Sequence, residues 1–194
     1  MRNSTLAVIA VCVGLLWVGE AHAARFETHA TDPAVPAGTV YDTTTKLLWE
    51  MKTSNAIGGL HDVGHRYTWS ASGSAADGTA FTSFLASLNG GDYYDPSLGL
   101  VVNSNPTNCF ANECDWRLPQ IGELKEILDL KTNGCRSTPC IAPVFGPTQS
   151  DFYWSATTET GNPTFAWMVD FRGGHMFSAD KIVDLYVRAV RSGL

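Results

Sequence analysis

Basic residues and long apolar runs are both scarce in this chain of 194 residues. There are 13 lysine and arginine residues against 19 aspartate and glutamate residues, and the formal net charge is -6. Proteins that bind nucleic acid usually carry an excess of positive charge, so a nucleic-acid partner is not expected. Disorder is not expected either, because six Trp, nine Phe and six Tyr provide enough apolar surface to offset the entropy lost on folding.

The common catalytic and ligand-binding motifs are also missing. The sequence has no G-x-S-x-G elbow, no P-loop and no H-E-x-x-H. The Glu-Pro-Asn and Trp-Asn-Asp triads with which calcium-dependent lectins hold sugars are absent as well. His61 and His65 are four residues apart, but the glycines around them indicate a solvated loop rather than a helical metal site. We therefore predict no enzyme activity, no cofactor and no bound metal.

The amino terminus has the features of a secretory signal peptide. Arg2 precedes an apolar stretch at Leu6–Val18, and the small residues Ala21 and Ala23 fit a cleavage site. Glu20 closes the stretch before it reaches the roughly 20 residues that a membrane span needs. The prediction is a signal peptide at 1–23 and a mature protein that is secreted, periplasmic or at the cell surface, with no membrane span.

Removing the signal peptide changes the cysteine count from five to four, because Cys12 is lost, and leaves the charge at -6. An even number of cysteines in an exported chain indicates disulfides. Their spacing favours two local pairs, each five residues apart, although the other two connectivities remain open. A four-cysteine zinc site is the alternative, and its usual ligand spacing is shorter. The four residues are Cys109, Cys114, Cys135 and Cys140.

The sequence pattern after the signal peptide predicts one α+β domain with two helices and a mainly antiparallel sheet. Residues 24–38, with two prolines and no apolar periodicity, are interpreted as a leader, and the domain as 39–194. Residues 53–78 are rich in small and polar residues and are interpreted as loop. The expected elements are a hairpin at 40–49, helices that begin near Phe81 and Ile121, and strands at 152–156, 165–171 and 185–190.

Several motifs in this order resemble the Lcl carboxy-terminal domain family, an exported bacterial domain named after a collagen-like adhesin. The motifs are LLWE at 47–50, CDWRLPQIGELKEILDL at 114–130, FYWSATT at 152–158, AWMVDF at 166–171 and YVRAVR at 186–191. The resemblance spans roughly 39–192 and implies a C-type-lectin-like fold, in which the terminal strands lie side by side and long loops carry the ligand.

The RLP segment at Arg117–Pro119 is also similar to formylglycine-generating oxidases. Those enzymes depend on two reactive cysteines late in the domain, and this chain has none after Cys140. An oxidase of that kind is therefore the least favoured alternative.

The signature residues are expected to be structural. Trp116, Trp154 and Trp167 are predicted to lie in the core, because tryptophan offers a large apolar area. Arg117 and Arg188 interrupt apolar strings, so each is expected to bury its stem and to pair its guanidinium with a carboxylate. The candidate carboxylates are Glu123, Asp151 and Asp170.

Ligand contacts are expected from aromatic residues in polar loops. The segment Asp92, Tyr93, Tyr94 and Asp95 combines aromatic faces with carboxylates, which suits stacking on sugars and hydrogen bonding to their hydroxyls. Trp69 is predicted to be a second exposed aromatic residue. The alternative for the two tyrosines is that they cover the core.

Two functions fit these features. The first is an exported, non-catalytic binding or adhesion module for carbohydrate or another extracellular polymer. The family's founding adhesin is associated with sulfated polysaccharides, but a charge of -6 opposes polyanions, so neutral glycans are favoured. The second is a structural or envelope-assembly protein whose partner is an envelope protein, since the chain shows no repeat stalk.

The tyrosine pair provides a direct test. If Tyr93 and Tyr94 stack on sugar rings, the doubly substituted Tyr93→Ala, Tyr94→Ala protein will bind polysaccharide more weakly than the wild type, which is expected to bind at micromolar strength. Titration of the two proteins against the same polysaccharide measures this. Equal affinity would show that the tyrosines do not contact the ligand.

Overall fold

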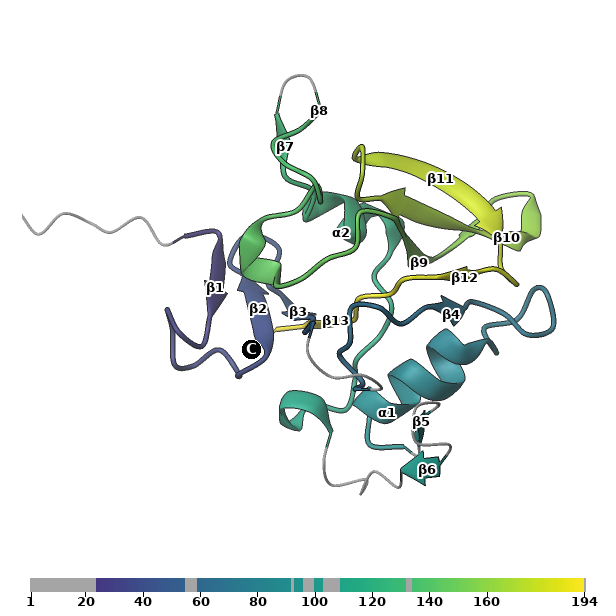
Figure 1. Ribbon diagram of the computed structural model, residues 1–194, viewed down its shortest axis with the longest axis horizontal. Coiled ribbons are helices and arrows are strands. Elements are labelled where there is room, and N and C mark those ends of the chain that lie inside the picture. Colours follow the sequence, from purple (N-terminus) through teal and green to yellow (C-terminus); the bar gives the residue numbers. More distant parts are fainter. Residues whose placement is uncertain are drawn as a thin grey trace, which may run out of the picture.

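The computed structural model describes residues 24–54, 59–91, 109–131 and 134–193, with the backbone of 93–95 and 100–102. Within these residues, short antiparallel strands and a few helical turns surround two apolar clusters (Figure 1). The predicted α+β class is confirmed.

Both ends of the described chain lie in one four-stranded antiparallel sheet, at its opposite edges. Its order is β1 (Phe26–Thr28), β2 (Thr39–Asp42), β3 (Leu47–Glu50) and β13 (Val190–Ser192). The hairpin β2–β3 matches the prediction for 40–49. Its turn is closed by the Asp42 carboxylate, whose Oδ1 accepts a hydrogen bond from the backbone N–H of Thr44 at 2.9 Å.

Residues 24–38 are part of the domain, so the prediction of a leader was wrong. Strand β1 lies in this segment and pairs with β2. The side chain of Val35 is fully buried, and the ring of Phe26 lies 4.9 Å from that of Phe145 in an edge-on contact. The segment contains two prolines and lacks apolar periodicity, so its sequence pattern gave no sign that tertiary contacts hold it in the domain.

A three-stranded sheet carries the aromatic motifs. Its order is β11 (His175–Asp180), β10 (Asn162–Asp170) and β9 (Phe152–Glu159), all antiparallel. Strands β9 and β10 confirm the predictions at 152–156 and 165–171. Strand β11 was not predicted. It forms because the turn after β10 reverses the direction of the chain. Six residue pairs then connect β10 with β11 without a bulge.

The strand predicted at 185–190 is divided between two sheets. Strand β12 (Asp184–Leu185) pairs with β4 (Tyr67–Thr68), a strand inside the segment interpreted as loop. The chain then passes along β9, where the backbone N–H of Tyr186 donates to the carbonyl of Phe152 at 3.1 Å. It enters the four-stranded sheet only at β13.

The first predicted helix runs through η1 (Ala80–Leu85), a π-helical turn, into α1 (Ala86–Leu88). Ala80, Phe84, Leu85 and Leu88 are buried on one face, in agreement with the predicted apolar spacing. The helix is preceded by Gly78, where any Cβ atom would collide with the carbonyl oxygen of Thr68.

The second predicted helix, α2 (Ile121–Glu126), ends earlier than expected. Its first N–H group, on Ile121, donates to the Thr157 hydroxyl of β9 at 2.9 Å, which supplies a cap from outside the helix. After the helix, β7 (Leu130–Lys131) and β8 (Gly134–Cys135) form a small hairpin. The disulfide to Cys140 holds this hairpin in place.

Both local disulfides are present, which settles the open connectivity. Cys109 pairs with Cys114 and Cys135 with Cys140, at Cα separations of 5.1 and 5.2 Å. Four further short elements complete the fold: β5 (Tyr93–Asp95), β6 (Leu100–Val102), η2 (Phe110–Asn112) and η3 (Pro143–Phe145).

Strand β10 separates the two apolar clusters. Alternate side chains of a strand point to opposite faces, so Met168 lies in a cluster with Trp154 and Phe84. Val169 lies in the other cluster, with Trp49 and other residues. Trp116 and Trp154 are buried as predicted. Trp167 is only half-buried, which corrects its assignment to the core.

Candidate functional site

The predicted exposure of Trp69 was wrong, because its side chain is 5% exposed. The indole N–H donates to the backbone carbonyl of Ser155 at 3.0 Å. The Lys181 ammonium lies 3.8 Å from the indole ring centre, a cation–π contact. Trp69 therefore supports the core and leaves no face for stacking on a sugar.

Three of the other predicted ligand residues lie in one short strand. Tyr93, Tyr94 and Asp95 form strand β5, which pairs with β6. Asp92 lies outside the described residues, and so do the side chains of β5. Ligand binding by this segment stays a prediction.

Arg117 fulfils the prediction of an arginine paired with a carboxylate. Its two terminal nitrogens each lie 2.7 Å from an oxygen of Glu123, the two-pronged geometry in which arginine binds most strongly. The Glu123 carboxylate also accepts the backbone N–H of Gln120 at 2.7 Å. These bonds lower the pKa of Glu123 against the effect of its partial burial. The RLP segment is thereby fixed to the start of α2.

Arg188 is also buried, but its direct partners are not the predicted carboxylates. One terminal nitrogen donates to the backbone carbonyls of Glu50 at 2.7 Å and of Phe145 at 2.9 Å. The other donates to the Thr148 hydroxyl at 2.8 Å and to the Pro147 carbonyl at 3.5 Å. The guanidinium thus connects strand β3 with the segment after η3, which are far apart in sequence.

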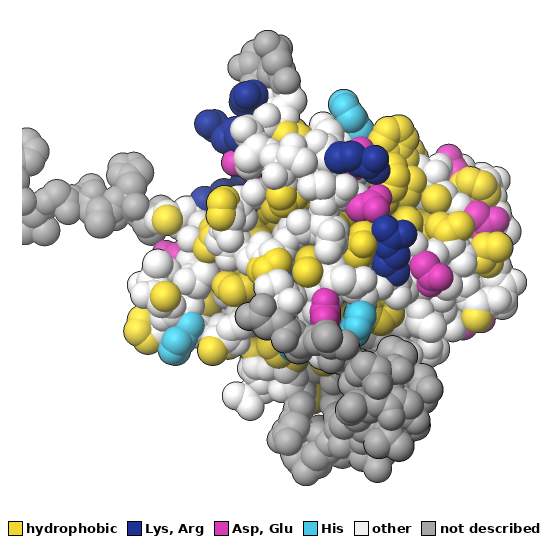
Figure 2. All heavy atoms as spheres, in the orientation of Figure 1, with side chains coloured by type: hydrophobic (Ala, Val, Ile, Leu, Met, Phe, Trp, Pro, Cys, Tyr) yellow, Lys and Arg dark blue, Asp and Glu magenta, His cyan; other side chains and the backbone are white. Residues whose placement is uncertain are grey.

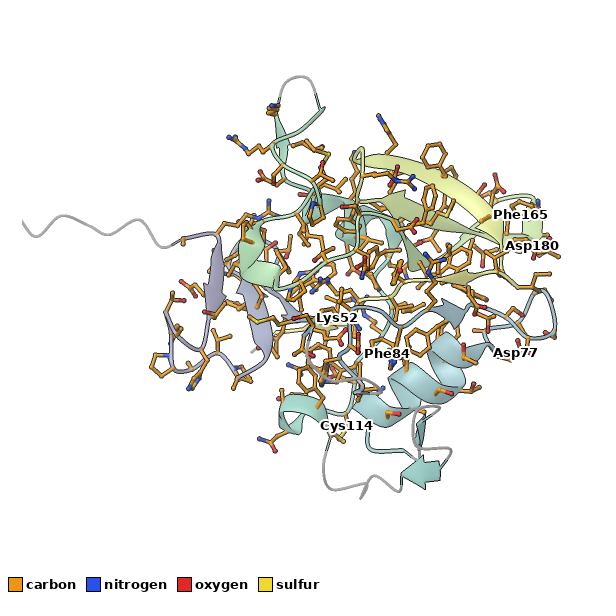
Figure 3. All side chains as sticks on the ribbon, in the orientation of Figure 1. Lys52, Asp77, Phe84, Cys114, Phe165 and Asp180 are labelled. Carbon is orange, nitrogen blue, oxygen red and sulfur yellow. A yellow bond between two sulfur atoms is a disulfide. The ribbon has the colours of Figure 1, made fainter. Side chains whose placement is uncertain are left out.

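Arg188 also interacts electrostatically with the carboxylate of Glu50, a buried residue that the sequence pattern did not single out. The Glu50 carboxylate lies 2.8 Å from the Lys52 ammonium and 2.8 Å from Nδ1 of His61. Its second oxygen accepts the backbone N–H of Ala189 at 3.0 Å. The Lys52 ammonium also lies 4.3 Å from the centre of the Phe84 ring (Figure 3).

The pKa of Glu50 is set by two opposing effects, burial and its charged or hydrogen-bonded partners. Burial alone raises the pKa of Glu50, but the Lys52 charge and the His61 hydrogen bond outweigh it and lower the pKa to about 2. Burial lowers the pKa of Lys52, and the Glu50 charge opposes that shift. The fully buried carboxylate is therefore ionised at neutral pH. It pairs with the Lys52 ammonium and also attracts the buried Arg188 guanidinium.

His61 was interpreted as part of a solvated loop, yet its side chain is only 26% exposed. Its ring also lies 4.3 Å from that of Phe110. A carboxylate on Nδ1 orients an imidazole as in many hydrolases. However, the hydrogen bonds of His61 in the described part of the chain include none to a hydroxyl or thiol nucleophile. The pair is best explained as part of the buried charge cluster.

A groove of about 550 Å³ lies between two loops next to this cluster. One wall is Ser137, Thr138 and Pro139, which belong to the loop closed by the disulfide Cys135–Cys140. The other wall is the segment 143–149, which Arg188 contacts from inside. All lining residues are uncharged: Val63, Ser137, Thr138, Pro139, Ile141, Pro143, Gly146, Pro147, Thr148 and Gln149.

Gly146 allows the second wall to lie close against the core. Its φ of 74° is in the region that favours glycine. A Cβ atom at this position would lie 2.6 Å from the backbone oxygen of Lys52. The groove wall thus packs directly on the chain that leaves strand β3, where the charge cluster begins.

The family model described as Lcl C-terminal domain matches residues 38–191. The chain belongs to this family. The resemblance predicted from the motifs is confirmed, and the match begins just before β2 and ends within β13. No curated protein and no solved structure matches the chain.

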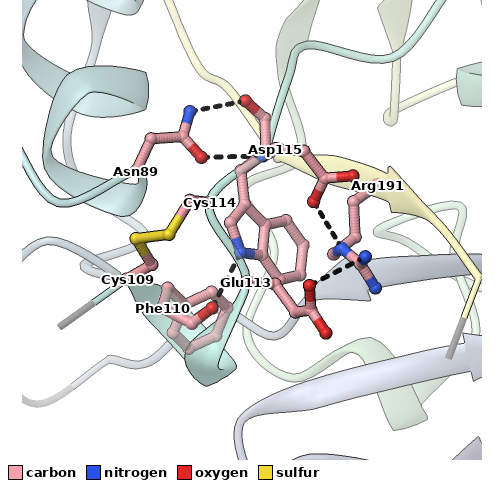
Figure 4. The surroundings of a disulfide bond; sticks show 8 residues. Asn89, Cys109, Phe110, Glu113, Cys114, Asp115 and Arg191 are labelled. Carbon is pink, nitrogen blue, oxygen red and sulfur yellow. Dashed lines mark hydrogen bonds and ion pairs between the residues drawn. A yellow bond between two sulfur atoms is a disulfide. The ribbon is translucent and has the colours of Figure 1, made fainter. Parts of the chain in front are cut away.

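The first disulfide of this Lcl C-terminal domain fixes the loop before the WRLP motif (Figure 4). The Asn89 side chain accepts the backbone N–H of Trp116 and donates to its carbonyl, both at 2.8 Å. Arg191 lies 2.6 Å from Asp115 and 2.9 Å from Glu113. These contacts connect the loop to α1 and β13. The disulfide is therefore part of a contact region that stabilises the fold.

The described part of the Lcl C-terminal domain contains neither a metal-binding cluster nor a membrane-spanning helix. Among the described residues, no three His, Cys, Asp or Glu side chains come close enough to hold a metal ion. None of the helices in this part of the chain has the length and apolar character that crossing a membrane requires. The uncharged groove, with its mixture of hydroxyl, amide and apolar side chains, is the candidate binding site.

The low pKa of Glu50 predicts a specific loss of stability in acid. A carboxylate whose pKa is lower in the folded than in the unfolded state stabilises the fold fully above pH 4.5, and this contribution is lost as the pH falls towards 2. The loss is on the order of 2–3 kcal/mol. Denaturant unfolding between pH 6 and pH 2 will show it as a falling free energy of unfolding.

Glu50→Gln is the variant for this measurement, and Glu126→Gln, at a side chain that is 58% exposed, is the control. We expect Glu50→Gln to be less stable at pH 7, because it leaves Lys52 without its counter-charge, and to depend less on pH. Unfolding curves of wild type and Glu50→Gln that run parallel from pH 6 to pH 2 would contradict the assignment.

Proposed function

We propose that the protein is an exported, non-catalytic binding module that holds a neutral, hydroxyl-rich polymer, such as a surface glycan, in the groove. The observation that carries this proposal is the lining of the groove, in which every residue is uncharged. A charged ligand would find no counter-ion there. A neutral ligand with many hydroxyl groups finds partners that match it.

The lining combines the two kinds of contact that such a ligand needs. The hydroxyls of Ser137 and Thr138 and the side-chain amide of Gln149 can each donate and accept hydrogen bonds. Between them, prolines and Ile141 offer apolar surface on which the carbon face of a sugar ring can pack. Binding sites generally have this mixture of apolar surface with a few placed polar groups.

Charge supports a neutral rather than an anionic ligand. The net charge is -6, which repels polyanions at distances up to about a Debye length. On the face seen in Figure 2, basic side chains stand beside acidic ones and form no continuous basic stripe. One example is Asp151, which contacts both Arg66 and Arg172.

The same proposal includes export and a C-type-lectin-like fold. Two disulfides are typical of proteins that fold in an oxidising compartment. The terminal strands lie in one sheet, and a second sheet with long connections stands beside it (Figure 1). In the first sheet β13 pairs with β3 and β1 lies at the opposite edge, so the two terminal strands share a sheet without lying side by side as the family resemblance implies.

Envelope assembly is a second candidate, and strand β11 favours it. This strand is the edge of its sheet, yet Met176 and Phe177 are 42% and 45% exposed. Figure 2 shows hydrophobic side chains gathered over this region. Exposed apolar edges often bind another protein. Capture of one stable envelope protein that Phe177→Lys releases would favour assembly over glycan binding.

Glycan binding is tested with the full-length protein on an array of neutral and sulfated polysaccharides. We expect retention by neutral chains, and a binding constant weakened by roughly 2- to 10-fold in Thr138→Ala and in Gln149→Ala, since each removes about one hydrogen bond. Isothermal titration with the retained polysaccharide gives the constants.

Thr164→Ala is the matched control, because Thr164 is an exposed threonine on β10 away from the groove lining. It is expected to bind like the wild type. Binding to sulfated chains alone, no binding at all, or an equal loss in the control would refute the proposed function.

A further inference from the structure

Arg188 holds one wall of the groove from inside the protein. Its side chain is fully buried, and it donates to Phe145, Pro147 and Thr148, of which the last two line the groove. A fourth bond, to the carbonyl of Glu50, anchors the guanidinium on strand β3. The arginine therefore bridges a central strand and the wall.

The wall has little regular structure of its own. After the single turn of η3, residues 146–149 belong to no helix or strand. Buried carbonyl groups without partners are costly, and the guanidinium fork supplies partners for two of them together with one hydroxyl. The planar fork has a fixed geometry, so it sets where these groups lie relative to each other.

The buried ring of Phe145 anchors only the start of the wall. It makes edge-on contacts with Phe26 and with Trp49, whose ring centre is 6.3 Å away. Beyond Phe145, the lining residues Pro147 and Thr148 depend on the fork of Arg188. Glu50, whose backbone and charge both face Arg188, makes burial of this cation tolerable.

We propose that Arg188 is a positioning residue for ligand binding, which fixes the wall at 145–148 in the shape that the ligand requires. This inference rests on the proposed function. The arginine touches no ligand itself, because it is absent from the groove lining. Its effect on affinity is therefore indirect, through the order of the wall.

The test is Arg188→Lys in the full-length protein, followed by amide hydrogen exchange. Lysine keeps the charge but has one nitrogen with three donors, so it cannot bridge Glu50 and the three groups of the wall. We expect the amides of Phe145, Gly146 and Gln149, which are hydrogen bonded in the wild type, to exchange at least about tenfold faster. Exchange in β10 and β11 is expected to remain unchanged.

Arg191→Lys is the matched control, because Arg191 is a similarly buried arginine whose partners are Asp115 and Glu113. It is expected to leave exchange at 145–149 at the wild-type rate. If Arg188→Lys leaves these amides as slow as in wild type, or speeds exchange equally throughout the chain, Arg188 does not position the wall.

Thr148→Val serves if Arg188→Lys does not fold. It leaves the arginine in place and removes one of its acceptors, together with the bond that the Thr148 hydroxyl donates to the Gly146 carbonyl at 3.3 Å. Faster exchange confined to 145–149 supports the proposal, and wild-type exchange contradicts it. Hydrogen exchange needs no ligand, so it separates the two claims. If exchange changes as expected but no glycan binds, the proposed function fails and the structural role stands, whereas binding unaffected by a loosened wall refutes positioning.

Discussion

The burial of three charges at one place constrains the whole domain. Glu50, Lys52 and Arg188 are all removed from water. The two cations repel each other, so their burial depends on the Glu50 carboxylate and on the backbone carbonyls that accept hydrogen bonds from Arg188. Their bonds join the central strand β3, the segment before β13 and the loop after η3. These segments are brought together only in the folded chain, so the charge cluster and the fold depend on each other.

Local features of the fold could be predicted from the sequence, because their causes are local. The β2–β3 hairpin, the apolar face that contains Phe84 and the pairing of Arg117 with Glu123 all join residues within a few positions. The two disulfides close loops with a sequence separation of 5. In each case spacing and residue type indicated the contact, and the structure decided among the disulfide pairings and carboxylate partners that the sequence left open.

The buried cluster and the groove could not be predicted in this way. Arg188 reaches Glu50 across 138 residues, and a carbonyl partner leaves no signal in residue types. Trp69 looked exposed because its neighbours in sequence are polar, whereas its indole is covered by Ser155 and Lys181. The groove is lined mainly by Ser, Thr, Pro and Gln residues, which form no recognisable motif in the sequence. Its distinguishing property is the lack of charged residues in the lining.

Charged and uncharged residues have different roles within this Lcl C-terminal domain. Charged residues such as Arg188 hold the frame from within, and a disulfide loop and an uncharged segment line the groove that we propose as the binding site. The most direct measurement is an NMR titration of the protein with a neutral oligosaccharide. The account predicts shifts of backbone amides concentrated at 137–149 and at Val63. Shifts centred on Tyr93–Asp95 or on β11 instead would contradict it.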